Sequence, residues 1–146
     1  MQHHLILRVV TKFLVGAIIL FALYVQFHGD YSPGGGFQAG VIMAVAFILY
    51  GVVFSVAKVQ QVLPPWLVHK LLALGVLIYA GTGVFSMLMG YNFLDYVAIN
   101  PGHPEEGQEY GIILVEFGVG VTVTGVMVAI YYAFAARTPI ISDEEW

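Results

Sequence analysis

One acidic side chain lies inside a long apolar stretch of this 146-residue chain. Glu116 falls early in the apolar run 112–136, about one helical turn after Gly111. A carboxylate within a membrane is costly, and such groups commonly mark paths for protons or cations. A carboxylate at the membrane boundary with a polar partner is the structural alternative. The sequence therefore makes Glu116 a candidate for an ion path, with Thr122 and Thr124 as hydroxyl-bearing neighbours further along the run.

A glycine-rich segment precedes a second apolar run. Its core is the hexapeptide Pro33, Gly34, Gly35, Gly36, Phe37 and Gln38. Glycine-rich loops before helices often hold phosphate, but here no β-strand pattern precedes the loop and no Gly-Lys-Ser/Thr follows. We therefore expect a rigid structural turn, in which the proline restricts the backbone and the glycines adopt angles closed to other residues. Phe37 is expected to fill a cavity in this chain or a neighbour, and Gln38 to satisfy backbone groups at the helix start.

Other chemistry finds little support in the sequence. Cysteine is absent, and His28, Asp30 and His103 lack the spacing of metal ligands. No nucleophile–base pair, cofactor ligand set or basic nucleic-acid-binding patch stands out. The chain is accordingly predicted to be no enzyme, and to bind no metal, cofactor or nucleic acid.

The elements that must position these residues are apolar helices. Hydrophobic residues make up 60% of the chain and charged residues only 10%, whereas a soluble domain carries about a quarter charged residues. Each apolar run exceeds or reaches the roughly 20 residues that cross a bilayer as a helix. The runs are 5–27, 37–57, 67–89 and 112–136. We predict an all-α integral membrane protein, with residues 1–146 forming one four-helix domain in the lipid bilayer.

The basic residues predict the orientation of these helices. All five flank the N-terminus, the second connection or the C-terminal tail: Arg8, Lys12, Lys58, Lys70 and Arg137. In a four-helix topology those regions share one side, and the positive-inside rule assigns that side to the cytoplasm. Both termini are therefore expected to be cytoplasmic, with Arg8 and Lys12 reaching the headgroups as anchors.

The stretch from Phe27 to Ala44 resembles a family hallmark. The residues His28-Gly-Asp-Tyr-Ser-Pro-Gly-Gly-Gly-Phe-Gln-Ala-Gly40 are similar to the F-x-G-H-x-x-P-G-G-G-F-Q-G-G motif of the B subunit of Mrp-type (Mnh) multisubunit sodium/proton antiporters. Asp30 stands where the family commonly has histidine, and Ala39 where it commonly has glycine. The resemblance covers the four-helix layout and most of the chain.

This resemblance implies a subunit of a hetero-oligomer in the cell membrane that exchanges Na⁺ for H⁺ together with the other Mrp subunits. Because the apolar interiors hold few ionisable groups, we expect an accessory subunit that packs beside the ion-translocating subunits and lines at most part of a cation path. One alternative is an accessory subunit of a related respiratory or hydrogenase-type ion-pumping complex. A second is a stand-alone small multidrug exporter, which needs a mid-membrane acid in its first helix, where this chain has none.

Overall fold

The computed structural model describes residues 5–29 and 34–135, and every regular element in these residues is helical. The elements are α1 (Leu5–Gln26), α2 (Gly36–Phe54), α3 (Val56–Val62), α4 (Pro65–Leu88), the short 3-10 helix η1 (Tyr96–Ile99) and α5 (Pro104–Ala135). Four of them, α1, α2, α4 and α5, are long and apolar enough to cross a membrane. The prediction of an all-α protein with four such helices is confirmed.

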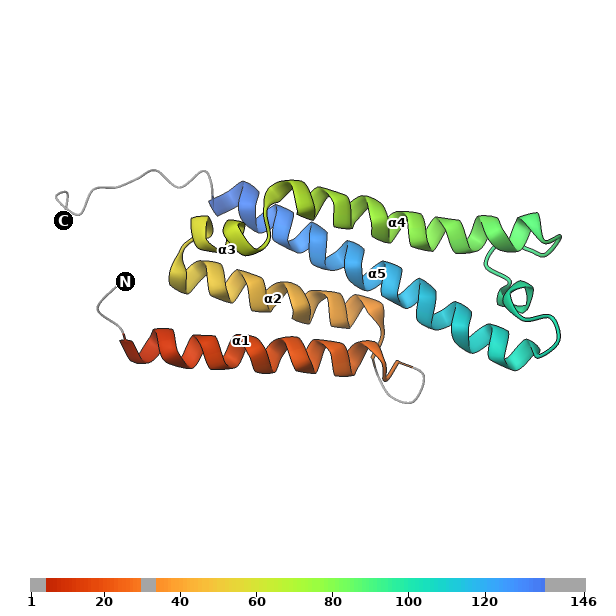
Figure 1. The fold of residues 1–146 in the computed structure, drawn as a ribbon, viewed down its shortest axis with the longest axis horizontal. Coiled ribbons are helices and arrows are strands. Elements are labelled where there is room, and N and C mark those ends of the chain that lie inside the picture. The colour runs from red at the N-terminus through yellow and green to blue at the C-terminus, as the bar shows by residue number, and fades with distance from the viewer. Residues whose placement is uncertain (1–4, 30–33, 136–146) are drawn as a thin grey trace.

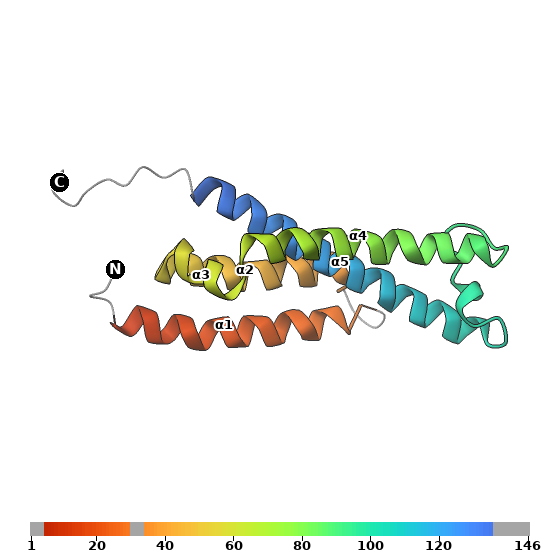
Figure 2. The same ribbon diagram turned by 45° about the horizontal axis from the view of Figure 1, so that its top comes forward.

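The four long helices pack in the spatial order α1, α2, α5, α4 (Figures 1 and 2). Helix α5 lies between α2 and α4, whereas α1 contacts mainly α2. The α1–α2 hairpin and the α4–α5 hairpin are staggered along their common direction, so α4 and α5 extend past the α1–α2 loop (Figure 1). This stagger sets the loop against the side of α5 rather than beyond its end.

The second predicted helix, 37–57, ends sooner than expected. Helix α2 stops at Phe54, and Ser55 adopts φ 113° and ψ 153° before α3 begins. These two angles are far from helical values and are almost restricted to glycine. The regular helix is therefore interrupted at Ser55. Residues 56 and 57 therefore belong to the separate helix α3, which packs back on the bundle.

The fourth predicted helix, 112–136, starts earlier than expected, at Pro104. Proline is favoured at the first helical position, and Glu105 and Glu106 in the first turn complement the positive end of the helix dipole. These polar turns add to a helix of 32 residues, about 48 Å long at the usual rise, which is more than the hydrocarbon thickness. Residues 104–111, which were expected to belong to the third connection, are therefore the polar first turns of α5.

The connection between α4 and α5 also folds on itself. Tyr96 of η1 packs so closely on Gly111 that a β-carbon there would overlap its ring. Burial, and then the neighbouring Tyr79, raise the pKa of the Tyr96 phenol above its usual value. Tyr96 thus serves as a packing residue that holds η1 against α5.

At the opposite end, a core of buried side chains joins α3, α4 and α5. Val59, Val68 and Val128 are almost fully buried there. The Tyr132 hydroxyl donates a 2.7 Å hydrogen bond to the Leu63 carbonyl oxygen, which satisfies the end of α3. This core fixes the α4–α5 pair relative to α2 at the end of the bundle that carries Lys58.

Candidate functional site

The side chain of Glu116 lies against the glycine-rich loop. A β-carbon built on Gly29 would fall 2.7 Å from Oε2 of Glu116, and one on Gly35 would fall 2.9 Å from Oε1. A β-carbon on Gly36 would overlap the Glu116 backbone carbonyl oxygen. Glu116 is half-buried, while Gly35 and Gly36 are buried. The structure thus joins the two features that the sequence singled out separately.

The loop can approach α5 this closely because glycines form its inner surface. Gly35 has φ +118°, a region that residues with a side chain rarely adopt, and its amide donates to the Val25 carbonyl oxygen at 3.4 Å. Gly36 then opens α2. The first amides of α2 form the positive end of a helix dipole, which offsets part of the cost of a carboxylate placed among apolar helices.

The remaining residues of the hexapeptide have different surroundings. Phe37 is 61% exposed, so its ring fills no cavity in this chain and is left for lipid or a neighbouring chain. Gln38 is exposed and makes no side-chain hydrogen bond within the described part of the chain. Pro33 lies outside the described residues.

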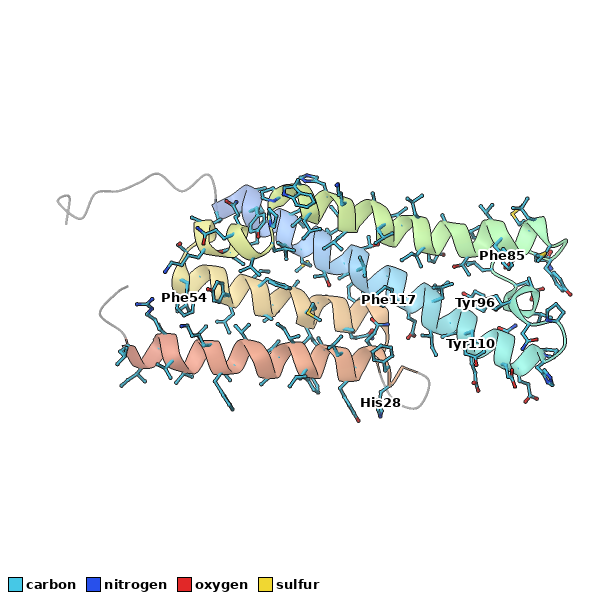
Figure 3. All side chains as sticks on the ribbon, in the orientation of Figure 1. His28, Phe54, Phe85, Tyr96, Tyr110 and Phe117 are labelled. Atoms are coloured by element: carbon cyan, nitrogen blue, oxygen red, sulfur yellow. The ribbon has the colours of Figure 1, made fainter. Side chains whose placement is uncertain are left out.

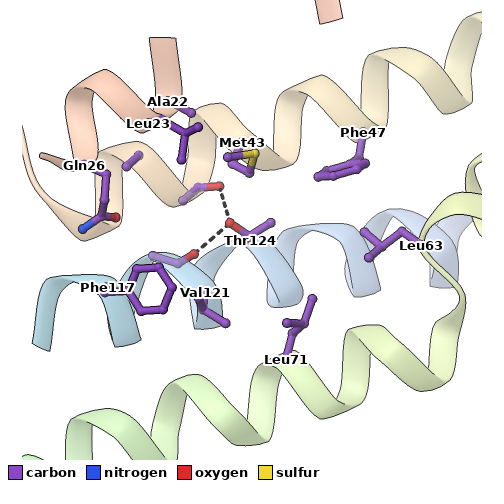
Figure 4. Close-up of a pocket in the computed structure, with 13 residues that line it drawn as sticks. Ala22, Leu23, Gln26, Met43, Phe47, Leu63, Leu71, Phe117, Val121 and Thr124 are labelled. Atoms are coloured by element: carbon purple, nitrogen blue, oxygen red, sulfur yellow. Dashed lines mark hydrogen bonds between the residues drawn. The ribbon is translucent and has the colours of Figure 1, made fainter. Parts of the chain in front are cut away.

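Thr124 faces the same side of α5 as Glu116. Its hydroxyl lies 2.8 Å from the Gly120 carbonyl oxygen and 3.1 Å from that of Gly40, which links α5 to α2 (Figure 4). Eight residues along a helix correspond to about 12 Å, so the hydroxyl and the Glu116 carboxylate do not form one ligand set. The Thr124 hydroxyl therefore serves chiefly to connect α5 with α2.

Thr122 lies on a different side of α5, against α4. Its hydroxyl donates a 2.8 Å hydrogen bond to the Gly118 carbonyl oxygen. A β-carbon on Gly75 of α4 would overlap that hydroxyl oxygen. The structure therefore separates Thr122 from Glu116 and does not assemble the three candidates around one point.

A cavity of about 240 Å³ lies among α1, α2, α4 and α5 beside Thr124 (Figure 4). Its wall is mostly apolar, with Met43, Phe47 and Phe117 among the large contributors. Ordered water generally needs two to four polar partners. This cavity is accordingly poorly suited to carry hydrated ions by itself.

Sequence reasoning assigned no role to two residues of this region, Gly29 and Gln26. Gly29 forms part of the surface under the carboxylate, although it stands outside the hexapeptide. Gln26 lines the cavity, is only 8% exposed, and its Nε2 has no hydrogen-bond partner within the described residues. The signal for Gln26 was available, because it is an amide at the end of an apolar run.

Comparison with known proteins bears on this arrangement. A family model described as "Domain related to MnhB subunit of Na+/H+ antiporter" matches residues 6–129, which cover the glycine-rich loop and most of each of the four long helices. The chain belongs to the MnhB family. The resemblance seen in the sequence is confirmed. The fold and the contact between Glu116 and the glycine-rich loop are therefore features of an MnhB-family chain.

Curated relatives of this MnhB-family chain match over nearly their whole length. A Staphylococcus haemolyticus protein named "Putative antiporter subunit mnhB2" is 36% identical over 136 residues, covering 92% of this chain and 96% of the relative. Proteins of the same name from Staphylococcus epidermidis and Staphylococcus aureus (strain Newman) are 36% and 35% identical over 131 residues, covering 88% of this chain and 92% of each relative. The match therefore extends well beyond the glycine-rich motif.

Proposed function

We propose that this chain is an accessory membrane subunit of a hetero-oligomeric Mrp-type Na⁺/H⁺ antiporter. The observation that carries the proposal is its membership in the MnhB family across residues 6–129, on four helices suited to a membrane. The proposed location is the cell membrane, with both termini in the cytoplasm. The proposed role is ion transport rather than enzymatic turnover.

The distribution of charge supports an accessory role. A proton or cation route through lipid needs a series of ionisable groups and water. Among the described residues of the four spans, Glu116 is the acid placed within apolar sequence, and the nearby cavity wall is mostly apolar. The complete exchange pathway is therefore assigned to other subunits, with this chain packed beside them.

The exposed apolar surface supports association with those subunits. Of the 18 most apolar consecutive residues of α1, only 11% are buried inside the chain. Large side chains such as Phe13, at 79% exposed, and Phe37, at 61%, project from the bundle. A membrane subunit can cover such surface with lipid or with neighbouring helices.

Co-purification tests the proposed parent complex. The tagged full-length chain should be extracted from its native membrane in mild detergent, and the retained proteins identified by mass spectrometry. Recovery of the other Mrp antiporter subunits is expected. Recovery of redox-cofactor-bearing subunits instead would favour the alternative, an accessory subunit of a respiratory or hydrogenase-type complex. Purification of the chain alone, with antiport unchanged after its deletion, would contradict both.

We further propose that Glu116 contributes to the cation or proton path where the glycine-rich loop meets α5. Glu116→Gln keeps the shape of the side chain and removes its charge. Antiport in everted vesicles should fall, or its pH profile should shift, while the complex still assembles on a native gel. Unchanged transport across the pH range would reduce Glu116 to a structural residue of the loop contact.

A further inference from the structure

Three cationic side chains converge on one aromatic ring at the end of α2. The guanidinium carbon of Arg8 lies 5.3 Å from the Phe54 ring centroid, and the ammonium nitrogens of Lys12 and Lys58 lie 5.8 Å and 6.0 Å from it. The cations come from α1 and α3, while Phe54 is the last residue of α2. We call Arg8, Lys12, Lys58 and Phe54 the basic cluster.

Nothing in the described structure neutralises the basic cluster. None of its three cations forms an ion pair or a hydrogen bond with the described residues. The described acids lie elsewhere: Asp95, Glu105, Glu106 and Glu109 belong to the α4–α5 connection and the start of α5, and Glu116 contacts the α1–α2 loop. Phe54 lies toward one end of the molecule, whereas Tyr96 of η1 and Tyr110 near the start of α5 lie toward the other (Figure 3).

The local attractions are too weak to offset three like charges. A neutral aromatic ring draws cations to its face but removes no charge. The carbonyl end of α2 supplies the equivalent of about half a negative charge. Roughly two and a half positive charges therefore remain in the cluster, and a dianionic ligand complements that charge better than a monoanionic one.

The position of the basic cluster points to a lipid. It sits at the end of two membrane-spanning helices, where headgroup phosphates are found. Val9 and Phe13, beside the two α1 cations, are 60% and 79% exposed and offer an apolar surface for acyl chains. We propose that the basic cluster binds the headgroup of an anionic phospholipid carrying two phosphodiester groups, of the cardiolipin type.

Native mass spectrometry of the full-length chain in mild detergent tests this proposal. The probes are tetraoleoyl cardiolipin, dioleoyl phosphatidylcholine and inorganic phosphate. Cardiolipin should remain bound, phosphatidylcholine should not, and millimolar phosphate should leave the bound cardiolipin in place. The triple change Arg8→Gln, Lys12→Gln and Lys58→Gln should weaken cardiolipin binding by roughly 100-fold, since each cation near a membrane surface is worth about a fivefold change in affinity.

Two control variants separate charge at the basic cluster from charge in general. Arg8→Lys, Lys12→Arg and Lys58→Arg together should keep cardiolipin affinity. Lys70→Gln, which removes the cation that lies 4.8 Å from the Trp66 ring, should also keep it. If the triple neutral variant fails to elute as a single species, the single change Lys58→Gln carries the test, with an expected loss of about fivefold.

Three results would overturn the proposal. Equal cardiolipin affinity in the neutral and wild-type chains would exclude the basic cluster as the site. Displacement of cardiolipin by phosphate would identify a site for small anions instead. Cardiolipin binding that arises only after Asp143, Glu144 and Glu145 are changed to amides would mean that the C-terminal acids occupy the basic cluster. None of these results would affect the proposed antiporter assembly.

Discussion

At Glu116, a charge and a set of glycines act as one unit. The carboxylate oxygens would lie 2.7 Å and 2.9 Å from β-carbons at Gly29 and Gly35, so the missing side chains create the space that Glu116 occupies. The start of α2 contributes a favourable dipole to the same place. The glycines of this loop therefore have a part in placing the acid, in addition to forming the turn.

Gly29→Ala should disturb Glu116 without preventing assembly. The new methyl group would meet the end of the Glu116 side chain, which can rotate away. Antiport measured in everted vesicles should fall or shift in pH profile as it does for Glu116→Gln, while the native-gel band of the complex remains. Adding Gly29→Ala to Glu116→Gln should cause little further loss, because both changes act on the same group.

Gly81→Ala is the matched control, because a β-carbon at Gly81 of α4 would have no neighbour within 4 Å. That variant should transport normally. Fully additive losses from Gly29→Ala and Glu116→Gln would contradict the idea that Gly29 acts through the carboxylate.

Among the helices, the start of α2 is constrained most tightly. A β-carbon on Gly36 would overlap backbone atoms of α5, which cannot rotate away as a side chain can. Gly35 combines a close approach with φ +118°. This junction explains the glycines at positions 35 and 36, because a side chain at either would meet Glu116 of α5, whereas a β-carbon on Gly34 would meet the Val25 carbonyl oxygen of α1.

Gly36→Ala should therefore lower stability and assembly, with an expected loss of about 1–3 kcal/mol for overpacking. The checks are detergent unfolding of the chain and a native gel of the complex. Gly16→Ala, in α1 with nothing within 4 Å of the added carbon, should be neutral or slightly stabilising.

Gly35→Val should resemble Gly36→Ala, since a β-branched residue tolerates positive φ poorly. Full assembly of both loop variants with lost transport would favour a direct role in ion access.

Ser55 offers the opposite test, a position where glycine should help. Its φ of 113° and ψ of 153° cost a residue with a side chain about 1–3 kcal/mol, and its side chain makes no capping hydrogen bond to α3. Ser55→Gly should raise the free energy of unfolding by about 1 kcal/mol after the greater backbone entropy of glycine is included. Ser55→Ala keeps the strain and should be nearly neutral. A less stable glycine variant would show that the break between α2 and α3 is not strained.

The elements show which parts of this structure a sequence can predict. The spans were predictable because a bilayer requires about 20 apolar residues in helical form. The helix break at Ser55 was not, because neither proline nor glycine marks it and serine rarely adopts a φ of 113°. The early start of α5 was missed because its first turns are polar, although Pro104 followed by two glutamates is a recognisable helix start. The contact between Gly29 and Glu116 joins residues distant in sequence, which no local pattern encodes.

At the scale of the whole molecule, charge is divided between the two ends of the bundle. Three of the four described Lys and Arg residues, Arg8, Lys12 and Lys58, meet at the end that holds the α2–α3 break, and the fourth, Lys70, lies near the start of α4. Four acids occupy the other end, in the α4–α5 connection and the first turns of α5. The basic and acidic residues thus lie at opposite ends of the bundle, and this separation is the basis of the proposed orientation.

Single cysteines introduced into this cysteine-free chain can test the orientation. Gly102 is exposed in the acidic connection, and Gln61 is exposed on α3 at the basic end. The positive-inside rule places Gly102 outside the cell and Gln61 in the cytoplasm. Gly102→Cys should therefore react with an impermeant maleimide added to intact cells, and Gln61→Cys should react only after the membrane is opened. Both variants must label equally in detergent, which shows that each thiol is accessible. The reverse pattern in intact cells would place both termini outside, and it would also move the basic cluster to the outer leaflet without changing its proposed ligand.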